Sequence, residues 1–297
     1  MQFVPQMPWK VQFLSSFSFA FVSKLCKKSE IEKFVGGRPG YTKDFLFGWL
    51  LVKKVTNWDY RTIASMADVS AATLCRANTF FLAKGIYEKV FSRLVRRAYT
   101  KGLIKGTYAA MDSSFVPTFS GKEEFGSENW NEFKKAYGFK LHLLIDAETK
   151  FPIALTITNG VAADCTLAIP LLKKAKRWLR QEGYVLADKG YDDQDIVNWV
   201  NKILKRKAGI PIRKISKRGK NYSWEGAWKN FHFKAKGRSL KKSIYNWRTA
   251  IERVFSLLKR TYHLGKEETR GINNFFKNTY LTLICYMLKL FDIAKSS

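Results

Sequence analysis

The chain has 297 residues, of which 46% are hydrophobic and 15% aromatic, so it is long enough to bury one large core or two modest ones. Its 53 lysines and arginines outnumber its 24 aspartates and glutamates, which gives a formal net charge of +29. A globular chain this basic usually binds a polyanion, either nucleic acid or an anionic membrane. No apolar run reaches the roughly 18 residues needed to cross a bilayer. The composition therefore favours nucleic acid as the partner and argues against a membrane.

The cysteines and histidines exclude several classes of site. Cys26, Cys75, Cys165 and Cys285 stand far apart, without a CxxC pair, and the three histidines show no metal-ligand spacing. This pattern argues against a zinc site and a disulfide framework, and it predicts a reducing, cytoplasmic setting. The sequence also lacks a Walker-type phosphate loop, so no nucleotide cofactor is expected.

The first hundred residues have a helical pattern. Residues 1 to about 37 are predicted to be mainly helical and to end at a glycine-proline turn, and a second helix is predicted around residues 43–55. Residues 60–76 then predict a helix, a tight turn at 67–69 and another helix with Ser70 as its N-cap.

This last segment resembles a helix-turn-helix, in which Ser70, Thr73 and Arg76 would lie at the start of the recognition helix. Any helical hairpin of small residues is the alternative. The high positive charge favours contact with DNA.

From Gly106 the pattern changes from helical to alternating, which predicts a boundary between a helical domain at 1–105 and a second domain at 106–297. Residues 107–116 are predicted as a strand with Asp112 on the same face as Tyr108 and Ala110. An acid among small residues in the middle of a strand needs a cation, because burial of a bare carboxylate is costly.

Two further strands are predicted at 134–146 and 151–158, antiparallel to the first, followed by a helix with Asp164 as its N-cap. A short buried strand then ends on Asp188, and acids at the carboxyl end of a parallel strand face the ligand crevice. The acids that follow, Asp192, Asp193 and Asp195, are interpreted as first-turn residues of the next helix. The last strand is predicted at 209–215.

Residues 214–242 are very basic and contain interleaved aromatic residues, including Trp224 and Trp228. This combination suits single-stranded or distorted DNA. A flap that only packs its tryptophans is the alternative.

Residues 245–259 predict a helix with an apolar face and a polar stripe of Tyr245, Arg248, Glu252 and Lys259 along its edge. One carboxylate between cations suits metal chemistry on a phosphodiester. An exposed ion-pair face is the alternative interpretation of such a stripe.

The spacing Tyr-x2-Arg-x3-Glu-x6-Lys, together with the two upstream aspartates, resembles the signature of DDE insertion-sequence transposases. The match spans roughly residues 107–290. The resemblance implies an α/β fold, in which an RNase H-like mixed sheet flanked by helices occupies 106–297 with a short basic and aromatic insertion at 214–242. An all-helical DNA-binding domain precedes it.

The resemblance also implies a site and a reaction. Asp112, Asp188 and Glu252 would be the catalytic, metal-binding carboxylates for two Mg²⁺ or Mn²⁺ ions, and Tyr245, Arg248 and Lys259 would hold DNA phosphates. The expected activity is endonucleolytic cleavage at the terminal inverted repeats of an element and transfer of the ends into double-stranded target DNA, by a homodimer associated with the nucleoid. Trp224 and Trp228 would contact bases near the cut.

Two alternatives remain from the sequence. The first is a metal-dependent nuclease of the same fold that cuts without joining. The second is a non-catalytic regulator that binds DNA through its helix-turn-helix.

Overall fold

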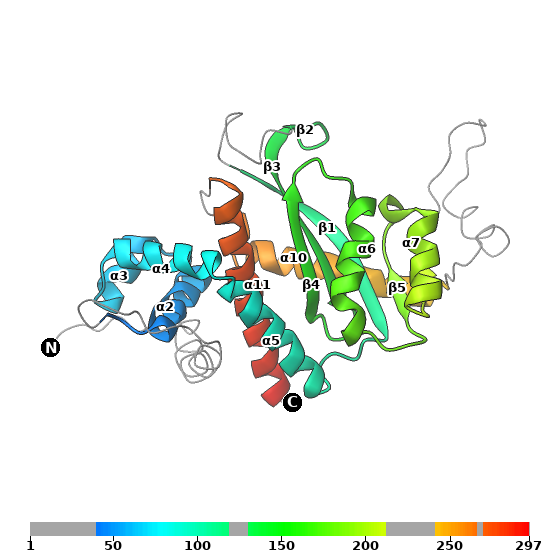
Figure 1. Cartoon of the computed structure of the whole chain (residues 1–297), viewed down its shortest axis with the longest axis horizontal. Coiled ribbons are helices and arrows are strands. Elements are labelled where there is room, and N and C mark those ends of the chain that lie inside the picture. The colour runs from blue at the N-terminus through cyan, green and yellow to red at the C-terminus, as the bar shows by residue number, and fades with distance from the viewer. Residues whose placement is uncertain (1–39, 119–129, 212–240, 266–269, 297) are drawn as a thin grey trace. The chain divides into compact units, whose positions relative to one another are not determined.

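The structure is a computed structural model that describes residues 40–118, 130–211, 241–265 and 270–296 (Figure 1). Contacts within the chain group it into two units. The first contains Met1–Arg97, Thr118–Phe125 and Leu257–Ser297, and the second contains Ala98–Pro117 and Gly126–Ser256. The C-terminal segment therefore groups with the N-terminal helices, whereas the division at 105/106 stays a prediction about domains.

The first unit is helical and is built around apolar faces that meet in one core. Its elements are α2 (Lys43–Thr56), α3 (Tyr60–Ala67), α4 (Ala71–Ala83), most of α5 (Ile86–Thr100) and α11 (Ile272–Ser296). Helix α11 packs against α2 and α4. Phe47, Phe81 and Tyr87 are almost fully buried and pack edge to face or tilted against one another. The apolar C-terminal helix α11 thus completes this core.

Side-chain caps and left-handed turns define the two short helices of this unit. The Asp59 carboxylate accepts hydrogen bonds from the amides of Arg61 and Thr62 and caps α3. Helix α3 ends at Asp68, which has a φ of 52°. Ser70 then caps α4, because its hydroxyl accepts from the Thr73 amide at 3.0 Å. The two helices, the turn between them and the N-cap at Ser70 agree with the sequence, whereas a DNA-binding helix-turn-helix stays a prediction.

The second unit contains a mixed six-stranded sheet. Its strands are β1 (Tyr108–Pro117), β2 (Trp130–Asn131), β3 (Ala136–Asp146), β4 (Pro152–Asn159), β5 (Tyr184–Leu186) and β6 (Lys207–Gly209). The order is β2-β3-β1-β5-β6, and β4 also pairs with β3. Strands β1, β3 and β4 are antiparallel, whereas β1, β5 and β6 are parallel. This is the predicted RNase H-like arrangement of three antiparallel strands followed by parallel ones.

The last strand differs from its prediction. Strand β6 ends at Gly209, where the sequence analysis expected the strand to begin. Pro211 has no backbone N–H for a strand ladder, which explains why pairing stops before it. Residues 212–215 lie outside the described part.

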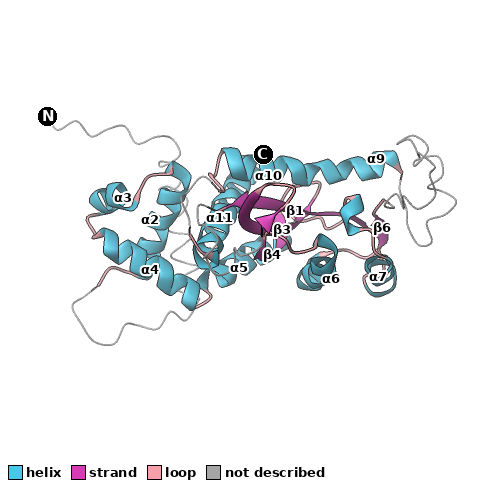
Figure 2. Cartoon of the chain, turned by 90° about the horizontal axis from the view of Figure 1, so that it is seen from above, coloured by secondary structure: helices cyan, strands magenta, loops and turns pink. Residues whose placement is uncertain are grey.

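Helices cover both faces of the sheet (Figure 2). Helix α6 (Asp164–Ala175) packs against β4, β3 and β1, with α7 (Gln194–Asn198) beside it. On the opposite face lie α9 (Lys242–Tyr245), the 3₁₀ turn η5 (Asn246–Arg248) and α10 (Thr249–Arg260). The Tyr108 ring of β1 stacks on Trp247 of η5 at 5.5 Å between centroids, which fixes which face of β1 is turned toward η5.

A buried arginine links the segments that lead into β1 and β5. The guanidinium of Arg206 donates hydrogen bonds to the carbonyl oxygens of Gly106 at 2.9 Å, Thr107 at 2.6 Å and Tyr184 at 2.9 Å, and also to that of Arg180. Burial lowers the pKa of Arg206 to about 10, although the nearby charge of Asp146 opposes this. Arg206 therefore stays charged at neutral pH and fixes the relative position of these two strands.

No helix within the described ranges has the combination of length and apolarity that crossing a membrane requires.

Candidate active site

The alternation of β1 turns Asp112 toward η5 and α10. Residues 108 and 112 share a face of the strand, and Tyr108 contacts Trp247 on that face. The Asp112 side chain is half-buried, and its Oδ1 accepts a hydrogen bond from the Ser113 amide at 2.7 Å. Asp112 is therefore held in the middle of a strand, on the side of the sheet that carries the signature helix.

Asp188 follows β5 in register with Asp112. Strands β1 and β5 are parallel and pair Tyr108 with Tyr184 and Ala110 with Leu186. Two residues further along both strands, the same register leads to Asp112 and Asp188. Neighbouring strands lie about 4.8 Å apart, so this register, continued by two residues, would place the two carboxylates next to each other. The charge of Asp188 acts on Asp112, in agreement with this position. Asp188 caps the 3₁₀ turn Lys189–Tyr191, and its Oδ1 accepts from the Gly190 amide at 2.7 Å.

The electrostatic environment of Asp112 opposes ionisation. Burial, which disfavours the charged form, and the negative charges of Asp188 and Asp164 raise the pKa of Asp112 to about 7, while the Ser113 amide and Arg248 act in the opposite direction. A carboxyl group in this state would be stabilised in its charged form by a cation.

The predicted stripe lies on two helices joined by a 3₁₀ turn. Tyr245 ends α9, Arg248 ends η5, and Glu252 lies in the first turn of α10. The Arg248 guanidinium lies over the Tyr245 ring at 5.6 Å and donates from Nη2 to Glu252 Oε1 at 2.6 Å. Burial lowers the pKa of Arg248, but Tyr245, Glu252 and Asp112 outweigh this effect and raise it. Arg248 is thus bonded to the third acid of the signature, and its charge also acts on the first aspartate.

The remaining signature residue is Lys259, seven residues after Glu252 in α10. Seven residues are almost two helical turns, so Lys259 lies on the same side of the helix, about 10 Å from Glu252 along its axis. Within the described residues, no group of three or more acidic, histidine or cysteine side chains is arranged to hold a metal ion. The side chain of Glu252 is 52% exposed and bound to Arg248 in this structure.

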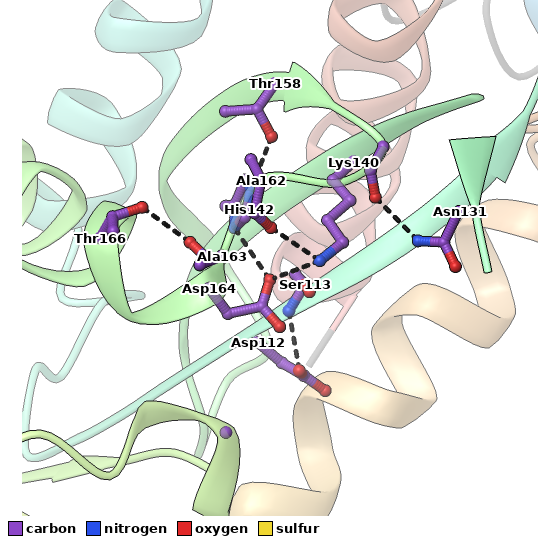
Figure 3. Close-up of polar contacts among 12 residues, drawn as sticks. Asp112, Ser113, Asn131, Lys140, His142, Thr158, Ala162, Ala163, Asp164 and Thr166 are labelled. Atoms are coloured by element: carbon purple, nitrogen blue, oxygen red, sulfur yellow. Dashed lines mark hydrogen bonds and ion pairs between the residues drawn. The ribbon is translucent and has the colours of Figure 1, made fainter. Parts of the chain in front are cut away.

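The sequence analysis missed a polar cluster on the opposite face of the sheet (Figure 3). Asp164, predicted as an N-cap, makes no capping hydrogen bond; Ala163 occupies the cap position instead. The Asp164 carboxylate accepts from Lys140 Nζ at 3.2 Å and lies 3.7 Å from His142 Nδ1. Burial lowers the pKa of His142 to about 4, so the ring is neutral at neutral pH and its contact with Asp164 is not an ion pair. On β3, Lys140 and His142 alternate with leucines. Two polar side chains on one face of an otherwise apolar strand are the sequence pattern that could have predicted this cluster.

The other predicted DNA contacts lie elsewhere in the chain. Ser70 and Arg76 are exposed and Thr73 is half-buried at the start of α4, in the first unit. Trp224 and Trp228 lie outside the described residues, so their predicted role rests on the sequence.

Comparisons with known proteins identify the family. Residues 105–288 match the model of the transposase DDE domain. This match covers more than half of the chain and includes all three predicted carboxylates and the whole signature. The chain therefore belongs to the DDE transposase family, whose members are enzymes that cleave and transfer DNA, as the resemblance of the sequence implied.

Solved structures similar to this chain are also transposases. A piggyBac transposase synaptic complex with hairpin DNA has 11% identity and a TM-score of 0.48, with 98% of this chain and 74% of that chain covered. The Mos1 mariner paired-end complex with Mn has 12% identity and a TM-score of 0.27, with 94% and 97% covered. A Mos1 complex with the left transposon end has 10% identity and a TM-score of 0.26, with 80% and 84% covered. None of the curated proteins matches the sequence.

The electrostatics of Asp112 predict an unusual effect of its neutralisation. A carboxyl group with a pKa of 3.8 when unfolded and about 7 when folded stabilises the fold at low pH, and this contribution is lost as the pH rises through 7. Without metal, Asp112→Asn should therefore be more stable than the wild type at pH 8, by on the order of 1–3 kcal/mol, since one pKa unit corresponds to about 1.4 kcal/mol and partial solvent access reduces the effect. Thermal unfolding in EDTA at pH 5 and pH 8 measures this difference.

The matched control for that measurement is Asp195→Asn, an exposed acid in the first turn of α7. Its effect should be small and the same at both pH values. A stability difference between wild type and Asp112→Asn that does not change between pH 5 and pH 8 would contradict the predicted environment of Asp112.

Proposed function

We propose that this transposase cleaves DNA at the ends of its element and joins them to target DNA, with Asp112, Asp188 and Glu252 as the catalytic carboxylates. The observation that supports this proposal is the parallel register of β1 and β5, which pairs Ala110 with Leu186, two residues before Asp112 and Asp188. The contact of Arg248 with Glu252, and its charge interaction with Asp112, support the inclusion of the signature helix in the same site.

We propose Mg²⁺ or Mn²⁺, as two ions, for this site. The three side chains offer hard oxygen donors, which these ions prefer. The pKa of Asp112 is raised by burial and by the charges of Asp188 and Asp164, so a bound cation would favour its charged form. Both observations fit a divalent cation held by Asp112 and Asp188, with Glu252 as the third ligand. Such ions, when bound, activate a water or 3′-hydroxyl nucleophile and stabilise the leaving oxygen.

The chain's own cations would position the DNA strand. Arg248 and Lys259 can neutralise phosphates, and the Tyr245 hydroxyl can donate to one. From Tyr245 to Lys259 the helical segment extends about 20 Å, which corresponds to several nucleotides of DNA. We therefore propose that α9, η5 and α10 hold the strand so that one phosphodiester lies beside the two aspartates.

The partners we propose are the terminal inverted repeats of the element and double-stranded target DNA. The net charge of +29 supports a polyanionic partner, and the capped helix-turn-helix offers exposed side chains at the start of α4. Because two ends must be cut and joined, we propose a homodimer with one active site for each end, acting in the cytoplasm at the nucleoid.

The role of the helix-turn-helix can be tested at Arg76, which is exposed in the first turns of α4. If Arg76 contacts a base edge, Arg76→Ala should reduce the preference for the terminal sequence over random DNA by about tenfold, since one good base contact contributes about 1–3 kcal/mol. Binding titrations on both DNAs at several salt concentrations measure this preference. An equal loss on both DNAs would assign Arg76 to the phosphate backbone.

A strand-transfer assay tests the proposed function against its nearest alternative. The full chain is incubated with Mg²⁺, a labelled and already cleaved element end, and a supercoiled target plasmid. A transposase should join the label covalently to the plasmid. A nuclease of the same fold would nick the plasmid without joining, and a DNA-binding regulator would do neither.

A further inference from the structure

The turn between β2 and β3 exposes an aromatic side chain almost completely. Phe133 is 98% exposed, whereas the next most exposed large hydrophobic side chain in the described residues, Ile203, is 51% exposed. A fully solvated phenyl ring is unfavourable, so its place at the apex of a turn calls for an explanation.

The turn that carries Phe133 is well defined. The Lys134 amide donates to both the backbone oxygen and Oδ1 of Asn131, at 3.1 and 3.0 Å. Lys135 takes a left-handed conformation with φ of 46°, and Trp130 pairs with Tyr137 across the hairpin. These contacts fix the path of the chain on both sides of Phe133.

Asn131 connects this turn to a second one. Its Nδ2 donates to the Gly160 carbonyl at 2.8 Å, in the turn that follows β4. Val161 in that turn is 45% exposed, and Trp130 in the hairpin is 39% exposed. The two connected turns therefore carry three exposed apolar side chains, Trp130, Phe133 and Val161, which we call the apolar patch, and Phe133 is the most exposed of them.

The charges around the patch indicate what it binds. Lys134 and Lys135 are exposed directly beside Phe133, with one acid, Glu132, on its other side. A protein interface with a buried centre would have to remove these lysines from water, whereas duplex DNA offers phosphates next to an apolar stack of bases. A single aromatic ring flanked by cations fits the step between two base pairs.

We propose that Phe133 inserts between base pairs of bound duplex DNA and bends it, while Lys134 and Lys135 contact the adjacent phosphates. This inference rests on the proposed function, since it specifies how the same enzyme holds its DNA. On β3, Tyr137 pairs with Trp130 and Leu143 pairs with Asp112. These two positions of β3 are six residues apart, which corresponds to at most about 20 Å. Phe133 lies three residues beyond the first pair, which adds at most about 10 Å. The insertion point would therefore lie within about nine base pairs of the phosphodiester beside Asp112.

The test compares a 30-base-pair duplex of mixed sequence with the same duplex carrying a central two-base mismatch, both in EDTA so that no cleavage occurs. A mismatch lowers the cost of opening the stack. The wild-type chain should therefore prefer the mismatched duplex by about tenfold in a competition titration, and dyes on the two DNA ends should report a bend. Phe133→Ala should reduce the preference to less than about twofold and remove the bend, while Phe133→Trp should retain both.

Ile203→Ala is the matched control, because Ile203 is an exposed apolar residue of the same unit far from this turn in sequence. It should bind and bend DNA as the wild type does. Phe133→Ala should melt within about 2 °C of the wild type, since surface substitutions usually change stability by less than about 0.5 kcal/mol. Lys134→Gln and Lys135→Gln should each reduce the salt dependence of binding by about one phosphate contact.

Three outcomes would overturn the proposal. Phe133→Ala could retain the wild-type preference and bend, which would exclude insertion while the proposed function stands. It could change only the self-association of the chain in sedimentation, which would assign the patch to a contact between copies. If the wild-type chain binds neither duplex, the proposed function fails as well.

Discussion

Replacement of Glu252 by glutamine should abolish DNA strand cleavage in Mg²⁺ while the chain still binds DNA. The amide has the shape of the carboxylate but lacks the charge that a divalent ion requires. Because metal ions stabilise the charge that develops on phosphate by several kcal/mol, the loss should be roughly a thousandfold or more. Gel analysis of cleaved element ends, with binding measured in parallel, separates the two effects.

The same loss is expected for Asp112→Asn and Asp188→Asn, and Asp192→Asn serves as the matched control. Asp192 lies only four residues after Asp188, at the C-cap of the 3₁₀ turn, yet no role in the site is proposed for it. Its substitution should leave cleavage unchanged and cost at most about 1 kcal/mol of stability. If one of the three carboxylate variants cleaves at the wild-type rate, that residue does not belong to the site.

The sequence predicted much of the second unit because its signals are local. The alternation of small and apolar residues around Asp112 predicted β1, and a short apolar run before Asp188 predicted β5. What the alternation could not predict was the register between the two strands, since pairing depends on contacts between residues far apart in sequence. The structure provides that register, in which Ala110 pairs with Leu186.

Other features depend on contacts that no local pattern contains. Asp164 has the sequence context of an N-cap, but Lys140 and His142 approach it from a strand about twenty residues away. Likewise, the apolar sequence of α11 is typical of a core helix but does not indicate which core the helix joins. It packs with α2 and α4, because their apolar faces require a third helix.

The signature stripe shows why one pattern supported two interpretations. The structure contains the ordinary i, i+4 ion pair between Arg248 and Glu252 that the alternative described. It also contains the charge interaction of Arg248 with Asp112, which an ordinary surface helix would lack. The difference between the two interpretations therefore lies in Asp112 on the strand, and the helix alone could not decide it.

Replacement of Arg206 should have the largest effect on the stability of the fold. Its guanidinium donates hydrogen bonds to four backbone carbonyl oxygens near the starts of β1 and β5. One of these acceptors, Gly106, has a φ of 68°. A Cβ at this position would lie 2.6 Å from the Trp178 carbonyl oxygen, so the backbone is closely packed here. The segment therefore cannot easily move so that its carbonyl oxygens reach other donors. Methionine at position 206 would match the length of the side chain but would remove all four hydrogen bonds of the guanidinium. The Gly106 and Thr107 oxygens would keep the backbone amide donors of Arg180 and Tyr184. Arg206→Met should therefore destabilise the protein by about 3–5 kcal/mol.

Thermal unfolding compares this variant with Arg180→Met, because Arg180 contributes only its backbone N–H and carbonyl to the network and its side chain is exposed. The control should remain within about 0.5 kcal/mol of the wild type. Since Arg206 fixes the two strands that lead to Asp112 and Asp188, the variant should also lose cleavage activity below its melting temperature. A misplacement of about 1 Å can cost a hundredfold in rate. If Arg206→Met melts with the wild type and cleaves at the wild-type rate, the hydrogen bonds of Arg206 do not determine the position of the two aspartates.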